Sequence, residues 1–293
     1  MKKLLLGLLG LAATMSAMAE SREIVSPNGG LKVCVSDDGG KAAYSVSLNG
    51  ATCIETSPLG IVLNFADYTS GLKMAQGEAQ RTVDVEYSLR NIKRSHVSHK
   101  ASEMVIPFTK DGKPVFDLMM HVSDNDVAFK YRIHAQENTQ VAVAKEEKTG
   151  FTLPDGTTTF LCPQSAPMHG FARTSPSYET NYTLDDTMGK NGWNEGYSFP
   201  CLFKVQHPQA PRGGKSNAAW VLISETGVDG SYCAGRLLCA ANSPLAGTQG
   251  AGVYTMGQPQ KGEMNGVGDV SPAIALPGET PWRTITIGET LAP

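Results

Sequence analysis

Hydrophobic residues recur at every second position along most of this chain, in short runs separated by Gly, Pro, Asn and Asp. In residues 82–92, for example, Val83, Val85, Tyr87 and Leu89 alternate with polar side chains. A period of two is that of a β-strand with one buried face. We find many such runs and no amphipathic helix between residues 20 and 293. The pattern therefore predicts an all-β protein, a large antiparallel β-sandwich that exceeds an immunoglobulin domain in size.

Turn residues and unbroken apolar runs refine this prediction. Asn49-Gly50 is a strong signal for a two-residue β-hairpin. Residues 219–224, Ala-Trp-Val-Leu-Ile-Ser, lack polar alternation, which predicts a buried strand. Glu225 and Asp229 flank the turn that follows it, and we expect both carboxylates to be solvated.

The N-terminus has the features of a secretory signal peptide. Lys2 and Lys3 precede a short apolar run, residues 4–13, and Ala17-Met18-Ala19 is a small-residue cleavage site. This segment is too short for a stable membrane span. We therefore expect a signal peptide over residues 1–19 and a mature domain over residues 20–293, located in a periplasm or outside the cell.

Charge and cysteine content narrow the function further. A net charge of -3, with 18% charged residues, does not favour nucleic acid or an anionic membrane surface as a partner. An oxidising compartment permits disulfides among the 6 cysteines. We expect most of them to be buried thiols, with Cys233 and Cys239 as candidates for a local pair. No Cys-x-x-Cys motif is present, which argues against a zinc ribbon.

Residues 177–203 hold a dense run of aromatic and acidic side chains. They include Tyr178, Glu179, Tyr182, Trp193, Glu195, Tyr197 and Phe199. Residues 185–192 predict a polar loop, and the alternation after it predicts a strand that begins at Trp193. Aromatic faces cover the apolar side of a sugar ring, and carboxylates bind hydroxyl groups or a hard cation. The alternatives are a sugar or cation site and an ordinary hairpin with its rings in the core.

Two other groups of polar residues could bind metal ions. His96-x-x-His99 could be a metal pair or an acid/base site, but no acidic third ligand lies nearby, and we expect solvated side chains. Residues 124–126, Asp-Asn-Asp, resemble part of a calcium loop. The Gly and the distal Glu of such a loop are missing, which predicts a simple turn.

Several pieces of the chain, in order, resemble the N-terminal domain of glycoside hydrolase family 97, a family of α-glucosidases and α-galactosidases. The pieces are Ser26-Pro27-Asn28-Gly29-Gly30-Leu31-Lys32-Val33, Ser57-Pro58-Leu59-Gly60, Tyr178-Glu179-x-x-Tyr182-Thr183, Trp220-Val221-Leu222-Ile223-Ser224-Glu225 and Thr280-Pro281-Trp282-Arg283-Thr284-Ile285. Together they span nearly the whole mature chain.

The resemblance implies a β-super-sandwich similar to galactose mutarotase. In the family this domain packs on a catalytic (β/α)8 barrel and lends one glutamate to a calcium ion in the active site. Glu179 stands at the matching position. Such a role suits a loop carboxylate, because Ca²⁺ is bound by six to eight oxygens. His169 is expected to lie on the barrel-facing surface.

The sequence departs from the family in one respect, since it contains no barrel. The other calcium ligands and both catalytic carboxylates of the family belong to the barrel, and glycoside hydrolysis needs a pair of carboxylates. We therefore expect a carbohydrate-binding accessory domain for an α-linked oligosaccharide, without glycosidase activity of its own. The alternatives are a free-standing carbohydrate-binding module and a mutarotase-like sugar epimerase, which would need a His and a carboxylate in a concave pocket.

Overall fold

The structure, a computed structural model, describes residues 20–91, 93–167, 181–207, 216–239, 252–262 and 270–292. In these ranges nearly all regular structure is β-strand, and the helical elements are two 3₁₀ turns, η1 (Asp38–Gly40) and η3 (Gly192–Asn194). The predicted all-β, antiparallel fold is therefore confirmed. Over the same ranges, no helix has the length and apolar character needed to cross a membrane.

One layer of the sandwich is built from the N-terminal strands and continues through strands from the middle of the chain. Pairing runs from β1 through β2, β3 and β4 to β13, and from there through β19 to β18. The bounds are β1 Ser21–Val25, β2 Leu31–Ser36, β3 Ala43–Leu48, β4 Ala51–Pro58, β13 Gly150–Thr152, β18 Arg236–Cys239 and β19 Val253–Gly257.

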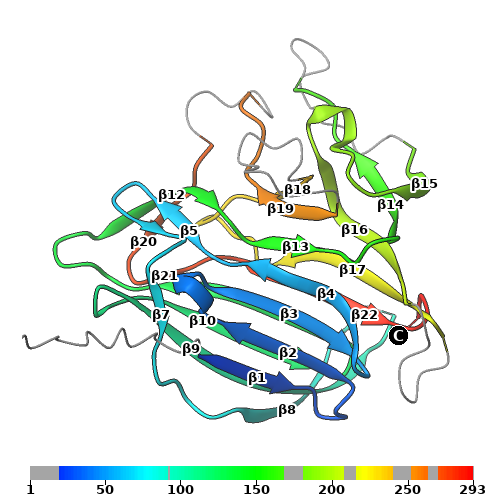
Figure 1. Ribbon diagram of the computed structural model, residues 1–293, viewed down its shortest axis with the longest axis horizontal. Coiled ribbons are helices and arrows are strands. Elements are labelled where there is room, and N and C mark those ends of the chain that lie inside the picture. The colour runs from blue at the N-terminus through cyan, green and yellow to red at the C-terminus, as the bar shows by residue number, and fades with distance from the viewer. Residues whose placement is uncertain are drawn as a thin grey trace, which may run out of the picture.

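Part of the second layer lies behind the first in Figure 1, and its strands β14, β15 and β16 rise at the upper right. Its pairing runs from β8 through β9, β10, β11, β22, β17 and β16 to β14 and β15, and β7 and β21 add short edges. The bounds are β7 Leu72–Met74, β8 Arg81–Ser88, β9 His96–Lys110, β10 Lys113–Ser123, β11 Asp126–Ile133, β14 Thr158–Pro163, β15 Thr183–Thr187, β16 Tyr197–Gln206, β17 Ala218–Thr226, β21 Gly278–Glu279 and β22 Trp282–Gly288.

The two layers are joined into one hydrogen-bonded sheet, because β16 also pairs with β18 through Tyr197 and Leu237. A smaller sheet lies beside them. It contains β5 (Ile61–Leu63), β6 (Asp67–Tyr68), β12 (Val141–Glu147) and β20 (Ala273–Ala275).

Strand alternation produces the core as predicted. On β11, Phe129 and Tyr131 are fully buried, whereas their polar neighbours are only partly buried. The ring centroid of Phe129 lies 5.0 Å from that of Tyr44 on β3, so the layers pack face to face. The alternating strand β8 also forms, but its Val85 and Tyr87 remain 42% and 46% exposed. The alternation therefore predicted the strand correctly but not its burial.

The hairpin predicted at Asn49-Gly50 is present between β3 and β4. Asn49 has φ 49° and Gly50 has φ 84°, so both residues adopt the left-handed conformation that a type I′ turn requires. Asn and Gly are the residues that tolerate this conformation best, which explains why the sequence signal was reliable.

An ion-pair cluster is buried inside the sandwich, and it corrects the expectation that Glu225 is solvated. Arg283 is fully buried and donates from Nε and Nη2 to the carboxylate of Glu147, at 2.9 and 2.6 Å. Its Nη1 lies 2.5 Å from Oε2 of Glu225, whose side chain is only 9% exposed. Glu225 is drawn inward because it pairs directly with Arg283 across β17 and β22.

All six cysteines are free thiols in the structure, so the candidate pair Cys233–Cys239 is not formed. Cys53, Cys162, Cys201 and Cys239 are buried, as expected for most of them. Burial raises the pKa of the partly buried Cys233 thiol to about 11, which keeps it protonated and unreactive at neutral pH.

We predict that Arg283→Met strongly destabilises the fold, because it leaves Glu147 and Glu225 as unpaired buried charges. The expected loss is about 3–5 kcal/mol of unfolding free energy, measured by urea denaturation. Adding Glu147→Gln and Glu225→Gln should restore part of the loss.

The matched control for this prediction is Arg132→Met, because Arg132 is half exposed and pairs with Glu279 near the surface. That variant should lose no more than about 1 kcal/mol. Equal unfolding free energies for the two single variants would contradict a structural role for the buried cluster.

Candidate functional site

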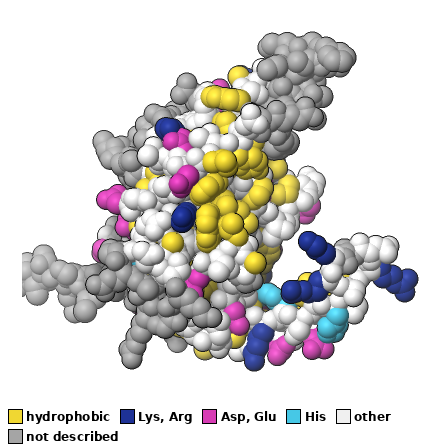
Figure 2. Space-filling view, turned by 90° about the vertical axis from the view of Figure 1, so that its right-hand side faces the viewer, with side chains coloured by type: hydrophobic (Ala, Val, Ile, Leu, Met, Phe, Trp, Pro, Cys, Tyr) yellow, Lys and Arg dark blue, Asp and Glu magenta, His cyan; other side chains and the backbone are white. Residues whose placement is uncertain are grey.

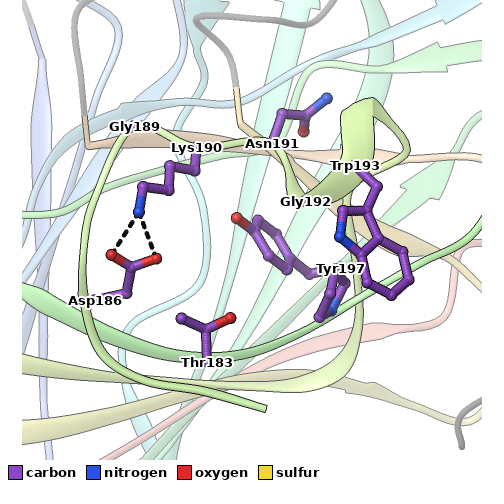
Figure 3. Close-up of a pocket in the computed structure, with 9 residues that line it drawn as sticks. Thr183, Asp186, Gly189, Lys190, Asn191, Gly192, Trp193 and Tyr197 are labelled. Carbon is purple, nitrogen blue, oxygen red and sulfur yellow. Dashed lines mark hydrogen bonds and ion pairs between the residues drawn. The ribbon is translucent and has the colours of Figure 1, made fainter. Parts of the chain in front are cut away.

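A pocket of about 360 Å³ opens within the stretch that the sequence singled out. It lies between β15, the start of β16 and the turn η3 (Figure 3). The lining residues are Pro163, Thr183, Asp186, Gly189, Lys190, Asn191, Gly192, Trp193 and Tyr197. Its volume falls in the range of small-molecule sites, about 300–1,000 Å³.

The predicted strand from Trp193 is wrong, because the chain turns there and β16 begins only at Tyr197. Gly192, Trp193 and Gly196 all have positive φ, at 34°, 45° and 86°. A Cβ at Gly192 would lie 2.8 Å from the Tyr197 ring and 2.9 Å from the Pro163 side chain, so only glycine fits. The apparent alternation therefore spans a tight turn bracketed by two glycines.

Hydrogen bonds to β18 hold this turn in place. The Asn191 side-chain oxygen accepts a bond of 2.7 Å from the backbone N–H of Cys239. The Arg236 guanidinium donates to the carbonyl oxygen of Glu195 and lies 3.4 Å from its carboxylate. Glu195, one of the acidic candidates, is therefore engaged in fixing the turn.

The turn projects Trp193 outward, and its side chain is 61% exposed. A non-glycine residue with positive φ is conformationally strained, and such strain tends to occur at functional sites. Figure 3 shows the Trp193 indole on one side of the pocket and the Asp186–Lys190 pair on the other, with Tyr197 between them.

The polar side of the pocket is formed by a close ion pair. Lys190 Nζ lies 2.6 and 2.7 Å from the two carboxylate oxygens of Asp186. This hydrogen bond is the main cause that holds the pKa of Asp186 below its usual value, so the group is a carboxylate at neutral pH. Burial raises the pKa of Tyr197 to about 12, which keeps its phenol protonated. The pocket therefore offers both donors and acceptors.

Glu179, the predicted calcium ligand, lies outside the described residues, as do Tyr178 and His169. They belong to segment 168–180, which connects β14 to β15. The described residues on either side reach the pocket, because both Pro163 of β14 and Thr183 of β15 line it. Within the ranges that the structure describes, no group of three or more His, Cys, Asp or Glu side chains could hold a metal ion.

A second candidate surface is apolar. The predicted buried strand forms as β17, with Val221 and Ile223 in the core, but Trp220 and Leu222 point to the opposite face and are half-buried. Together with Leu202 of β16 they line a groove of about 250 Å³. Thr286, Gly288, Thr290 and Leu291 complete it. Figure 2 shows a contiguous apolar area on the side of the molecule where the C-terminus lies in Figure 1.

The histidines only partly follow the prediction. His96 is exposed as expected, but His99 Nε2 lies 2.8 Å from Nε2 of His121. Nδ1 of His121 lies 3.0 Å from Glu103, which also pairs with Arg81. This cluster was not predicted, because His121 lies on the next strand, β10. The Asp-Gly turn between β9 and β10, which places His121 opposite Glu103, was the signal that could have found it.

The fold and these two surfaces define the chain as a sandwich domain whose described residues form a pocket of mixed polarity and an apolar groove. The model of the glycosyl-hydrolase 97 N-terminal family matches residues 24–293, and the chain belongs to this family. A probable retaining alpha-galactosidase from Streptomyces bingchenggensis (strain BCW-1) is 26% identical over 250 residues, which are 85% of this chain and 32% of that protein.

Solved structures agree with this assignment. The crystal structure of a beta-arabinopyranosidase is 40% identical with a TM-score of 0.80, over 92% of this chain and 40% of that chain. A glycoside hydrolase family 97 enzyme from Pseudoalteromonas sp. strain K8, in complex with panose, is 21% identical with a TM-score of 0.68, over 92% of this chain and 36% of that chain. The chain thus spans well under half the length of these relatives.

We predict that Gly192→Ala disrupts the pocket, because the added methyl group clashes with Tyr197 and Pro163. The matched control is Gly156→Ala, since Gly156 also has positive φ but an added Cβ there would meet no atom within 4 Å. The control should lose about 1 kcal/mol of unfolding free energy and Gly192→Ala about 2–4 kcal/mol. Equal losses in thermal or urea unfolding would show that the close packing at Gly192 does not matter.

Proposed function

We propose that this chain is the accessory sandwich of a family 97 glycosidase, packing on a catalytic (β/α)8 barrel beside a bound α-linked oligosaccharide. In this proposal Glu179 is a ligand of a calcium ion that is shared with the barrel. The observation that carries the proposal is the apolar outer face formed by Leu202, Trp220 and Leu222.

An apolar outer face is unusual for an antiparallel sheet whose other face covers the core. Such sheets alternate apolar and polar residues, because the outer face is solvated. On β17 both faces are apolar instead, and contiguous apolar surface of this kind marks interaction sites. Leu291, 66% exposed near the end of the described chain, borders the same groove. The proposal therefore places the barrel against this face.

The calcium proposal rests on family resemblance and on the described residues that flank segment 168–180 in sequence, since Pro163 and Thr183 line the pocket. Ca²⁺ takes six to eight oxygen ligands, so a single glutamate can be only part of its site. Asp186, the carboxylate in the pocket, is already paired with Lys190. We therefore assign the remaining oxygens to the barrel. When bound, the ion supplies a positive charge that orients substrate oxygens and stabilises developing negative charge.

We also propose that the domain works after export to the periplasm or outside the cell. The support is the signal-peptide pattern of residues 1–19, in which Lys2 and Lys3 precede an apolar run and Ala17-Met18-Ala19. The epimerase alternative has less support. His99, His121 and Glu103 converge, but they line neither the pocket beside Trp193 nor the groove beside Trp220.

The docking proposal predicts that Leu222→Asp weakens association with a catalytic barrel, because a carboxylate would be buried in an apolar contact. The barrel would be the part of the similar beta-arabinopyranosidase outside the matched region, produced separately and mixed with this chain. Association would be measured by calorimetry, with an expected loss of affinity of about tenfold or more.

The matched control for docking is Thr52→Asp, an exposed position on β4 in the other layer, which should leave affinity unchanged. Two results would overturn the proposal. One is no association of the wild-type chain with the barrel, and the other is equal affinity of the Leu222→Asp and wild-type chains.

The calcium proposal predicts that Glu179→Gln weakens Ca²⁺ binding by the assembled chain and barrel by roughly tenfold or more, because affinity depends on the number of charged ligands. Calorimetric titration with CaCl₂ checks this. Glu78→Gln, at an exposed glutamate, is the control and should bind as the wild type does. Unchanged calcium affinity of Glu179→Gln would show that this carboxylate is not a ligand.

A further inference from the structure

We propose that the pocket beside Trp193 is a subsite that binds one pyranose ring of an oligosaccharide without cleaving it. The ring stacks on the Trp193 indole, and its hydroxyl groups bond to the Asp186–Lys190 pair. The class of ligand rests on the proposed function, whereas the position and the residues come from the geometry of the pocket.

Trp193 is the tryptophan whose position is hardest to explain by packing. Its indole is 61% exposed on a backbone with φ 45°. Trp220 and Trp282, by contrast, each contact another aromatic ring and a lysine ammonium group. Burying an indole is favourable and a positive φ is unfavourable. The exposure of the Trp193 ring and its backbone conformation therefore each lower the stability of the domain. A ligand that stacks on the exposed face would recover the lost burial.

The opposite side of the pocket suits hydroxyl groups. A sugar hydroxyl both donates and accepts hydrogen bonds, so Asp186 can accept from it while Lys190 donates to it. The two groups are held 2.6 Å apart, close enough for neighbouring hydroxyls on one ring to reach both. A pyranose has an apolar face and a polar rim, which matches an aromatic platform beside a charged pair.

The described lining of the pocket favours binding over hydrolysis. Asp186 is the one carboxylate among the lining residues, and the nearby Glu195 is engaged by Arg236. Glycoside cleavage needs two carboxylates placed across the bond. A volume of about 360 Å³ is near the lower end for ligand sites, about 300–1,000 Å³, which suits one ring. The subsite would therefore recognise a ring away from the bond that the barrel cleaves.

Indole resonances test this directly, because the chain contains only 3 tryptophans. The full chain, labelled with ¹⁵N, is titrated with α-linked glucose and galactose di- and trisaccharides. The Trp193 indole N–H signal is assigned by its absence in Trp193→Phe. We expect it to shift on titration, while the signals of Trp220 and Trp282 stay in place. A Trp193 signal that does not move in a folded protein at saturating sugar would overturn the proposal.

Variants then distinguish the loss of ring stacking from a loss of folded protein. Trp193→Ala should weaken sugar binding roughly threefold to tenfold, and Trp193→Tyr should retain most of it, because an aromatic face remains. Lys190→Met should also weaken binding, whereas Lys204→Met, which alters a lysine over Trp220, is the matched control and should not. Equal affinities of wild type and Trp193→Ala would contradict the stacking role.

Failure of the subsite proposal can be distinguished from failure of the proposed function. The sugar titration uses this chain alone, whereas the docking test uses an added barrel. A shift at Trp193 without barrel association would leave the subsite intact and favour a free-standing carbohydrate-binding module. Association with the barrel without any effect of sugar on Trp193 would leave the docking proposal intact and refute the subsite.

Discussion

The buried interaction of Arg283 with Glu147 and Glu225 is the constraint on which the rest of the structure depends. It joins β22 and β17 of the large sheet to β12 of the small sheet. It also fixes register. Because β17 is apolar on both faces, its hydrophobic pattern cannot distinguish the correct pairing from a slip of one residue, which would exchange core and surface residues. A slip would separate Glu225 from Arg283 and leave charges unpaired in the interior. The ion pair therefore specifies the register of β17 and β22, which the apolar pattern does not.

With that register fixed, β16 contributes residues to both the pocket and the apolar groove. Tyr197 at its start lines the pocket, and Leu202 lines the apolar groove. These residues are five positions apart, roughly 17 Å along an extended strand. One strand therefore contributes to both surfaces, and the proposed sugar subsite and the proposed docking face share it.

Local patterns predicted much of the fold, and long-range pairing accounts for most of what they missed. The hairpin at Asn49-Gly50 and the alternation on β11 follow from adjacent residues. The role of Glu225 does not, because its partner Arg283 is 58 residues away in sequence. At Trp193 the alternation resembled a strand, although the flanking glycines indicated a turn. The aromatic and acidic composition of this stretch pointed to the pocket, but the exposure of the indole depends on contacts made by β18.

Two features of the sequence do not suit the exposed positions that their residues occupy, and both have the same energetic consequence. A strand with two apolar faces and a tryptophan held outward at positive φ both reduce the stability of the domain taken by itself. Natural sequences are otherwise locally consistent with their folds, and departures are expected where binding is required. The core tolerates these departures because the buried cluster and the strand pairing hold both surfaces in place. Contact with a partner on one surface and with sugar on the other would recover the apolar burial that the isolated domain lacks.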